Sequence, residues 1–200
     1  MQPPVAGILL AAGEGSRLGQ PKALVEVAGQ RLVDRGSRML RDGGAAPIVV
    51  ITGAAPVDVP GALVVHNPAW PSGMGSSLAL GLSALRSLPG ECGAAVLALA
   101  DQPLVGSESV RRLIAARVAG ASIAVAAYDG RPRNPVLIAR EHWTEVLTLA
   151  KGDAGARPFL RAHPDLVTLI ECGDTGSPDD IDTPEDLARV TQALLHRDQS

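Results

Sequence analysis

The chain has 200 residues, of which 46% are hydrophobic and only 2% aromatic, and its formal net charge is −3. This length corresponds to about one domain, whose core needs no metal or disulfide in order to fold. The composition excludes a disordered chain, and no apolar run reaches the roughly 20 residues of a membrane span. The slightly acidic charge and the scarcity of aromatic residues argue against nucleic-acid and membrane-surface partners.

The cysteines and histidines give no sign of a metal or disulfide framework. Cys92 and Cys172 are isolated in the sequence and lack the paired spacing of a zinc site. The four histidines show neither the spacing of a metal pair nor a neighbouring serine or cysteine nucleophile. The N-terminal residues also lack the basic and apolar segments of a signal peptide, so a cytoplasmic protein is expected.

Short apolar runs alternate with segments of helical periodicity along the whole chain. Strands are expected at residues 5–11, 47–52, 62–66, 94–100, 122–127, 135–139 and 167–170. Helices are expected at residues 31–40, 76–85 and 107–118, the last capped by Ser107, and after Thr183, where Pro184 and Asp186 mark a helix start. This alternation predicts an α/β fold: one domain over residues 1–200, a three-layer sandwich with a mostly parallel sheet and helices on both faces.

The loop after the first strand carries a pattern typical of a phosphate site. Gly13 and Gly15 allow the backbone to approach a ligand, and consecutive N–H groups in such a loop can cradle phosphate. Arg17 and Lys22 add two positive charges. The loop is not a P-loop, and Leu18 stands where the dinucleotide fingerprint has its third glycine. The alternative interpretation is a glycine-rich turn with solvated basic residues.

A carboxylate follows the strand expected at residues 94–100. Ligands of parallel sheets lie beyond the C-terminal ends of the strands, and Asp101 stands at such an end. A carboxylate there can hold Mg²⁺ between triphosphate oxygens. The alternative is a turn that ends the strand before Pro103.

Residues 10–22 resemble the start of nucleotidyltransferases that bind an NTP on a Rossmann-like, GT-A-type sheet. The shared pattern is Leu-Ala-Ala-Gly-x-Gly-x-Arg-x-Gly followed closely by Lys. Lys22 follows Gly19 by three residues, which is similar to molybdenum cofactor nucleotidyltransferases, whereas sugar-nucleotide pyrophosphorylases have their Lys farther on. Ala12 before Gly13, together with the Asp-Gln-Pro turn at Asp101, resembles the cytidylyltransferase branch more than the guanylyltransferase branch. One departure is Gly15, where the molybdenum branch usually has Ser.

The resemblance implies a nucleotide-diphospho-sugar-transferase-like fold in which roughly residues 5–120 bind the nucleotide and the remainder binds the acceptor. Nucleotide contacts are implied for the first loop, the stretch before the second helix and the turn after the fourth strand: Leu10, Ala11, Ala12, Gly13, Glu14, Gly15, Ser16, Arg17, Lys22, Asn67, Ser72, Gly73, Ser76, Ser77, Asp101 and Gln102. Acceptor contacts are implied for two later motifs: Asn134, Gly152, Asp153, Gly155 and Arg157. The guanidinium of Arg157 can meet a phosphate through two hydrogen bonds.

A second metal ligand is implied near the last helix. Capping accounts for Thr183 and Asp186 but leaves Asp182 without a role. In related cytidylyltransferases the first Asp of an Asp-Thr-Pro-Glu-Asp segment binds metal, so the resemblance implies that Asp101 and Asp182 hold Mg²⁺. The neighbouring Asp179 and Asp180 are expected to be solvated loop acids.

The resemblance implies a reaction that transfers CMP from CTP to the phosphate of molybdopterin and releases pyrophosphate. A phosphate monoester, with its second pKa near ~6, is already mostly ionised at neutral pH, so no general base is needed. Catalysis then depends on positioning and on charge neutralisation by the catalytic residues Arg17, Lys22 and Asp101. The alternatives are a GTP-using guanylyltransferase, a sugar-phosphate nucleotidyltransferase, and a nucleotide-binding factor that hands a cofactor to a molybdoenzyme without turnover. With few aromatic residues, base and pterin recognition is expected to depend on backbone and polar contacts.

Overall fold

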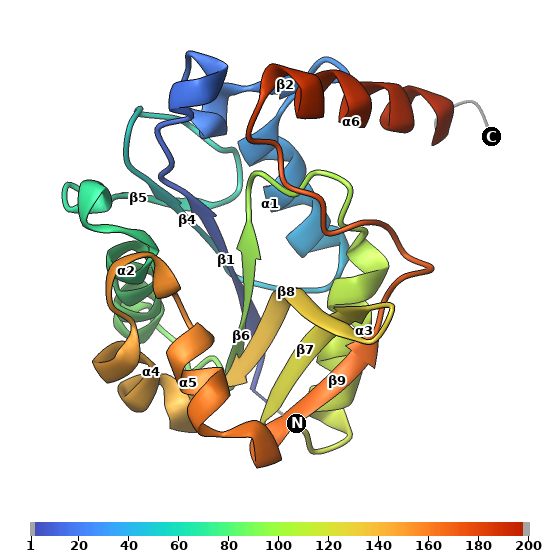
Figure 1. The fold of residues 1–200 in the computed structure, drawn as a ribbon. Coiled ribbons are helices and arrows are strands. Elements are labelled where there is room, and N and C mark those ends of the chain that lie inside the picture. Colours follow the sequence, from blue (N-terminus) through green and yellow to red (C-terminus); the bar gives the residue numbers. More distant parts are fainter. Residues whose placement is uncertain (1–2, 198–200) are drawn as a thin grey trace.

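The computed structural model describes residues 3–197, which form a single domain around one seven-stranded sheet (Figure 1). The strand order is β5-β4-β1-β6-β8-β7-β9, and only β8 runs against its neighbours in the described sheet. The strands are β1 (Val5–Ala11), β4 (Ile48–Thr52), β5 (Leu63–His66), β6 (Ala94–Leu99), β7 (Ile123–Tyr128), β8 (Arg131–Ala139) and β9 (Val167–Glu171). A separate hairpin pairs β2 (Glu26–Val27) with β3 (Gln30–Arg31). The predicted mostly parallel α/β fold is confirmed.

Helices cover both faces of the sheet (Figure 1). The helices are α1 (Leu32–Asp42), α2 (Met74–Ser87), α3 (Ser107–Val118), α4 (Trp143–Leu149), α5 (Arg157–Ala162) and α6 (Pro184–Arg197). Helices α1 and α3 pack on one face, and α2, α4 and α5 pack on the other. Strand β1 shows why both layers are needed, because Leu9 is buried against the first face and its neighbour Ile8 against the second.

Capping signals set the starts of α6 and α3 in different ways. Before α6, the Asp186 N–H donates to the Thr183 hydroxyl at 3.2 Å, and the Thr183 N–H donates to the Asp186 carboxylate at 3.0 Å. The predicted reciprocal cap is thus confirmed. The prediction that Ser107 caps α3 is wrong: Gly106 holds the cap position, and the Ser107 hydroxyl accepts a hydrogen bond from Arg111 at 3.2 Å.

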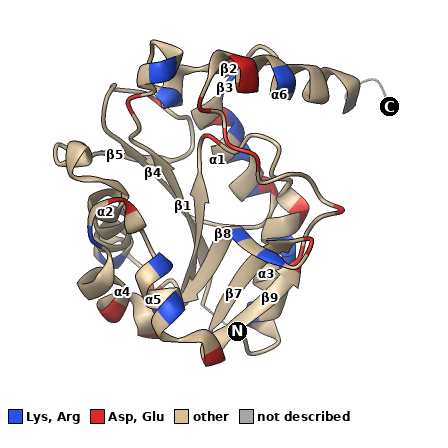
Figure 2. Ribbon diagram, in the orientation of Figure 1, with Lys and Arg blue, Asp and Glu red and all other residues tan. Residues whose placement is uncertain are grey.

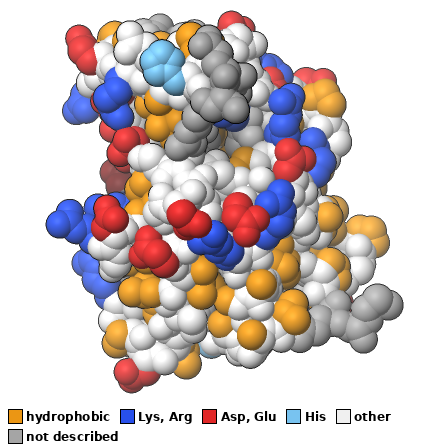
Figure 3. Space-filling model, turned by 90° about the vertical axis from the view of Figure 1, so that its right-hand side faces the viewer, with side chains coloured by type: hydrophobic (Ala, Val, Ile, Leu, Met, Phe, Trp, Pro, Cys, Tyr) orange, Lys and Arg blue, Asp and Glu red, His pale blue; other side chains and the backbone are white. Residues whose placement is uncertain are grey.

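One side of the molecule, at α3 and β9, carries a band of charged side chains above an apolar area (Figure 3). Arg112 of α3 donates two hydrogen bonds of 2.7 and 2.6 Å to Asp174, and Arg111 meets Glu108 at 2.6 Å. These charges therefore compensate one another within the protein. Throughout the described residues, every helix is too short or too polar to span a membrane.

Candidate active site

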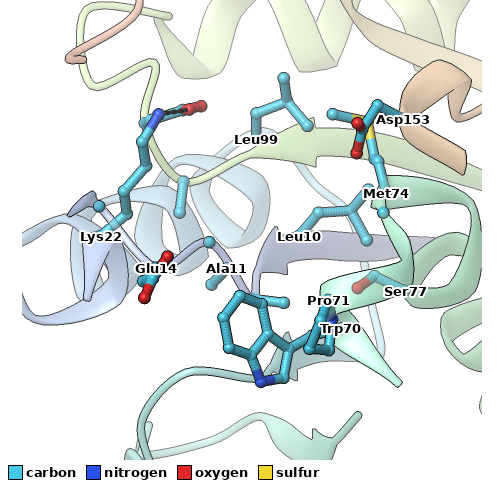
Figure 4. Close-up of a pocket in the computed structure, with 16 residues that line it drawn as sticks. Leu10, Ala11, Glu14, Lys22, Trp70, Pro71, Met74, Ser77, Leu99 and Asp153 are labelled. Carbon is cyan, nitrogen blue, oxygen red and sulfur yellow. Dashed lines mark hydrogen bonds and ion pairs between the residues drawn. The ribbon is translucent and has the colours of Figure 1, made fainter. Parts of the chain in front are cut away.

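A crevice lies at the edge of the sheet where the connections from neighbouring strands run in opposite directions. From β1 the chain crosses to β4 on one side, whereas β6 lies on the other side of β1. Such a point leaves space beyond the C-terminal ends of the two strands. A cavity of about 330 Å³, the β1–β6 cavity, lies there (Figure 4). Its lining residues are Leu10, Ala11, Ala12, Gly13, Glu14, Gly15, Lys22, Trp70, Pro71, Gly73, Met74, Ser77, Leu99, Ala100, Asp101 and Asp153.

The first loop turns sharply at Gly15. This residue has φ 63° and ψ 39°, a left-handed conformation that favours glycine. A Cβ atom there would also collide with the carbonyl oxygen of Gln20, so this backbone has no room for the Ser of the molybdenum branch. The Lys22 N–H donates to the Gly13 carbonyl at 3.1 Å and closes the loop. Within the described chain, the N–H groups of residues 13–15 donate to no protein acceptor, so they are free to bind an anion.

Lys22 joins the first loop to two acidic segments that are distant in sequence. Its Nζ atom lies 2.6 Å from an oxygen of Asp101, after β6, and 2.6 Å from an oxygen of Asp182, before α6. A backbone hydrogen bond of 2.8 Å from Ile181 to the Asp101 carbonyl holds the two acidic segments together. Burial lowers the pKa of Lys22, but the charges and hydrogen bonds of the two carboxylates outweigh it and raise the pKa above its ordinary value of 10.5. Lys22 is therefore a fixed positive charge.

The two carboxylates offer a donor set that suits a divalent cation. Both reach the same positive atom, Nζ of Lys22, so their oxygens converge on one small volume. Within residues 3–197, no three His, Cys, Asp or Glu side chains are grouped so as to hold a metal ion by themselves. Mg²⁺ commonly binds to one or two carboxylates and completes its shell with substrate phosphates and water. Asp101 and Asp182 fit that pattern.

Arg17 lies apart from this cluster. It belongs to the short 3-10 helix η1 (Ser16–Leu18), is exposed, and lies outside the lining of the β1–β6 cavity. In the part of the chain that the structure describes, its guanidinium has no hydrogen-bond or ion-pair partner. The neighbouring Ser16 hydroxyl donates to Glu14 at 3.3 Å. The structure thus brings Lys22 and Asp101 together and leaves Arg17 at the surface.

The stretch from residue 67 to residue 77 is shaped by a buried amide. Nδ2 of Asn67 donates to the hydroxyls of Ser76 and Ser77 at 2.9 and 3.0 Å, and its Oδ1 accepts the Ala69 N–H at 2.9 Å. Asn67 is 3% exposed and lies outside the cavity lining, whereas Ser77 lines it. The Ser72 hydroxyl donates to the Ala69 carbonyl. Asn67 therefore acts in this structure as a scaffold for the loop.

A larger cavity of about 940 Å³, the acceptor-side cavity, adjoins the first and shares Asp101, Leu10, Leu99 and Met74 with it. Its walls are mostly aliphatic. Its polar and charged lining residues come from β8, α5, the turn after β6 and the segment before α6: Asp101, Gln102, Arg133, Asn134, Arg157, Arg161, Asp180 and Asp182. Figure 2 shows basic residues on β8 and α5 and acidic residues along the segment that leads to α6.

The predicted acceptor residues divide between the two cavities. Asn134, Gly155 and Arg157 line the acceptor-side cavity, whereas Asp153 lines the β1–β6 cavity. Gly152 lines neither cavity and contacts Gly73, where a Cβ atom would collide with its carbonyl carbon. Arg157 donates a hydrogen bond of 2.8 Å to the Asp153 carbonyl, so besides lining the cavity it stabilises the loop that carries Asp153.

Gln102 holds the segment before α6 in place. Its Nε2 donates to the Pro178 carbonyl at 3.0 Å and to Asp180 at 2.8 Å. Asp180 is exposed, as expected of a loop acid, but its carboxylate also accepts this bond and lines the acceptor-side cavity. Burial and the negative charge of Asp101 raise the pKa of Asp180 above its ordinary value.

Sequence reasoning assigned no role to several lining residues of the two cavities, among them one aromatic and two basic side chains. Trp70 lines the β1–β6 cavity, and Arg133 and Arg161 line the acceptor-side cavity. Trp70 had a usable signal, since it is the aromatic residue within a stretch already expected to recognise the base. Arg133 lies beside Asn134 in a predicted acceptor motif, whereas Arg161 gave no signal.

Known proteins match this chain over most of its length. A family model described as the MobA-like NTP transferase domain matches residues 7–167. Nicotine blue oxidoreductase from Paenarthrobacter nicotinovorans is 37% identical over 202 residues, which cover 94% of this chain and 97% of that protein. A solved homolog of Rv0371c from Mycobacterium sp. strain JC1 is 28% identical, with a TM-score of 0.81 and coverage of 98% and 99%. Rv0371c from Mycobacterium tuberculosis H37Rv is 25% identical, with a TM-score of 0.80 and coverage of 96% and 100%, and a manganese complex of it has also been solved.

Proposed function

The chain belongs to the MobA-like NTP transferase family and is a nucleotidyltransferase, and from this premise we propose that it transfers CMP from CTP to the phosphate of molybdopterin. The observation that carries the proposal is the convergence of Lys22, Asp101 and Asp182 at the junction of the two cavities. Lys22 and Asp101 line the β1–β6 cavity, and Asp101 and Asp182 line the acceptor-side cavity. A nucleotide in the first cavity and an acceptor in the second would meet at this charged point.

The nucleotide-binding half of the proposed reaction is supported by the first loop. Its free N–H groups at residues 13–15 orient the β and γ phosphates of the nucleotide. Lys22, a fixed cation, balances the charge that develops on the leaving pyrophosphate. Asp101 and Asp182 would hold Mg²⁺, which would supply further positive charge for the phosphates.

The acceptor needs no side chain that removes a proton. Its phosphate monoester is already mostly ionised at neutral pH and attacks the α-phosphorus of CTP directly, with pyrophosphate leaving. Arg133, Arg157 and Arg161 around the acceptor-side cavity supply positive charge for that phosphate. The volume of about 940 Å³ and the aliphatic walls suit a bulky ring system better than a single sugar ring.

The name of the 37% identical relative makes an oxidoreductase the second candidate. Such a reaction commonly uses a nicotinamide dinucleotide as the electron donor. The dinucleotide fingerprint has glycine where this chain has Leu18, whose side chain packs against the apolar cluster beneath α6. The first loop therefore supports an NTP over a dinucleotide.

Ligand-induced stabilisation and pyrophosphate release test the proposal together. We expect Mg²⁺ with CTP to raise the melting temperature more than Mg²⁺ with GTP, or NADH alone, because a ligand that binds only the native state stabilises it. Pyrophosphate should appear when molybdopterin is added with CTP, and not when glucose 1-phosphate replaces it. Stabilisation by GTP and not CTP would identify a guanylyltransferase. Binding of NADH without any NTP effect would overturn nucleotidyl transfer for this site.

A further inference from the structure

The two ends of the β1–β6 cavity differ in chemistry (Figure 4). One end carries Lys22, Asp101 and the free N–H groups of the first loop. In Figure 4, Asp153 lies across the cavity from Lys22, with Leu10 and Leu99 between them. If the proposed function holds and phosphates occupy the positive end, the nucleoside part of the ligand extends toward the other end.

Trp70 gives the cavity an aromatic surface on a wall near Ala11 and Pro71, apart from Asp153 (Figure 4). In the described range it is the one aromatic residue that lines either cavity. Its position is restricted by the backbone, since a Cβ atom added at Gly53 would come within 2.6 Å of the Trp70 Cβ and Cγ atoms. Aromatic side chains bind bases by stacking, a contact worth about 1–3 kcal/mol per base. The second tryptophan, Trp143, is fully buried in the core and donates its Nε1–H to the Ile138 carbonyl.

Asp153 gives the end of the cavity opposite Lys22 a hydrogen-bond acceptor. Its carboxylate has no hydrogen-bond or ion-pair partner among the residues that the structure describes. A carboxylate repels phosphate oxygens and accepts hydrogen bonds only, so an N–H or O–H group of a ligand is the partner that suits it. Ser77 also lines the cavity and already accepts a hydrogen bond from Asn67, which leaves its hydroxyl proton available to the ligand.

We propose that the part of the cavity between Trp70 and Asp153 is the base subsite, with the Trp70 indole against the base and Asp153 accepting a hydrogen bond from an exocyclic amino group. The inference rests on the proposed function and adds the residues that select the base. Cytosine presents an amino donor at the position where uracil presents a carbonyl acceptor. Asp153 therefore favours CTP over UTP, because uracil would turn its carbonyl oxygen toward the carboxylate.

Binding of CTP, UTP and inorganic tripolyphosphate, each with Mg²⁺, tests the subsite by calorimetry. Asp153→Asn keeps the size of the side chain and removes its charge, and we expect the preference for CTP over UTP to fall about 10-fold or more. Trp70→Leu should weaken CTP binding about 10-fold. Neither change should alter the affinity for tripolyphosphate, which lacks a base and serves as the control for folding. Trp70 fluorescence should change when CTP binds, and the Trp70→Leu variant, which keeps Trp143, should show no change.

The outcomes separate the two levels of the proposal. The base subsite is wrong if the native protein binds CTP no more tightly than tripolyphosphate. It is also wrong if both variants keep the native affinity for CTP and the native preference for CTP over UTP. In either case the phosphate site stands. If no nucleoside triphosphate and no tripolyphosphate binds, the proposed function itself fails.

Discussion

The two halves of the sheet build their cavities by different means. In the half formed by β5, β4, β1 and β6, all strands are parallel, and the cavity lies at their C-terminal ends. In the half formed by β8, β7 and β9, the reversed strand β8 interrupts this order, and the cavity wall includes α5 and the segment before α6. The first half follows a general rule of parallel sheets, whereas the second depends on a helix and a loop from outside the sheet.

This difference also separates the proposed tasks of the halves. The parallel half presents backbone N–H groups and a fixed cation, which suit a triphosphate of any base. The other half presents a large aliphatic cavity with arginines, which suits one kind of acceptor. Asp101 lies between them and lines both cavities. Substitutions that act on one half and not on the other therefore test whether the division is real.

The largest effect is expected at the junction. Asp101→Ala removes one of the two carboxylates that converge on Lys22, and with it one of the two proposed metal ligands. We expect turnover to fall by about 10²–10³-fold or more while the protein stays folded, because loss of one preorganised charge contact costs that much. Pyrophosphate release measures turnover, and circular dichroism reports the fold. As a control, Asp165→Asn changes an exposed carboxylate that lines neither cavity and should leave turnover unchanged. Near-native turnover of the Asp101→Ala variant would contradict the assignment of Asp101 to the metal site.

A smaller effect, confined to the acceptor half, is expected at β8. The guanidinium of Arg133 contacts only the carbonyl of its neighbour Pro132 within the described chain, at 3.0 Å, and lines the acceptor-side cavity. Arg133→Ala should raise the KM for molybdopterin about 10-fold, the effect of one exposed charge-assisted hydrogen bond, and leave the Kd for CTP unchanged. Arg131→Ala, two residues away and outside the cavity lining, is the matched control. Equal effects of the two variants would show that Arg133 acts only through general charge.

The sequence predicted most of the parallel half because its signals are local. Asp101 lies just after a fully apolar strand, and the ends of parallel strands meet at one edge, so periodicity made it a candidate for a site. The resemblance then favoured a metal ligand over a simple turn. Lys22 was recognised through the spacing of the first loop. Asp182 lies 160 residues from Lys22, and only the resemblance to known enzymes placed the two in one site.

The rest could not be predicted because it depends on contacts between distant loops. Asp153 lies in the β1–β6 cavity because the loop at Gly152 packs directly on Gly73. The sequence of neither segment predicts that the two are in contact. Arg161 reaches the acceptor-side cavity only through the way α5 is placed against the sheet. Trp70 was not predicted as a site residue, because the scarcity of aromatic residues led to the expectation that polar and backbone contacts recognise the base. That scarcity says nothing about where each aromatic residue lies.

The smallest of the expected effects concerns the contact between the halves. Gly75, near the start of α2, approaches the loop after α4 so closely that a Cβ atom would lie 2.7 Å from the Ala150 carbonyl oxygen. Gly75→Ala must move a backbone segment, which typically costs about 1–3 kcal/mol in the free energy of unfolding. Gly81→Ala in the same helix is the matched control, since its Cβ would meet a side chain, Ile8, at 2.8 Å. Urea unfolding should show a larger loss for Gly75→Ala. Because the displaced loop continues into Asp153, this variant should also weaken CTP binding, and Gly81→Ala should not. A destabilised Gly75→Ala variant with native affinity for CTP would mean that the contact between Gly75 and Ala150 stabilises the fold but does not position the nucleotide.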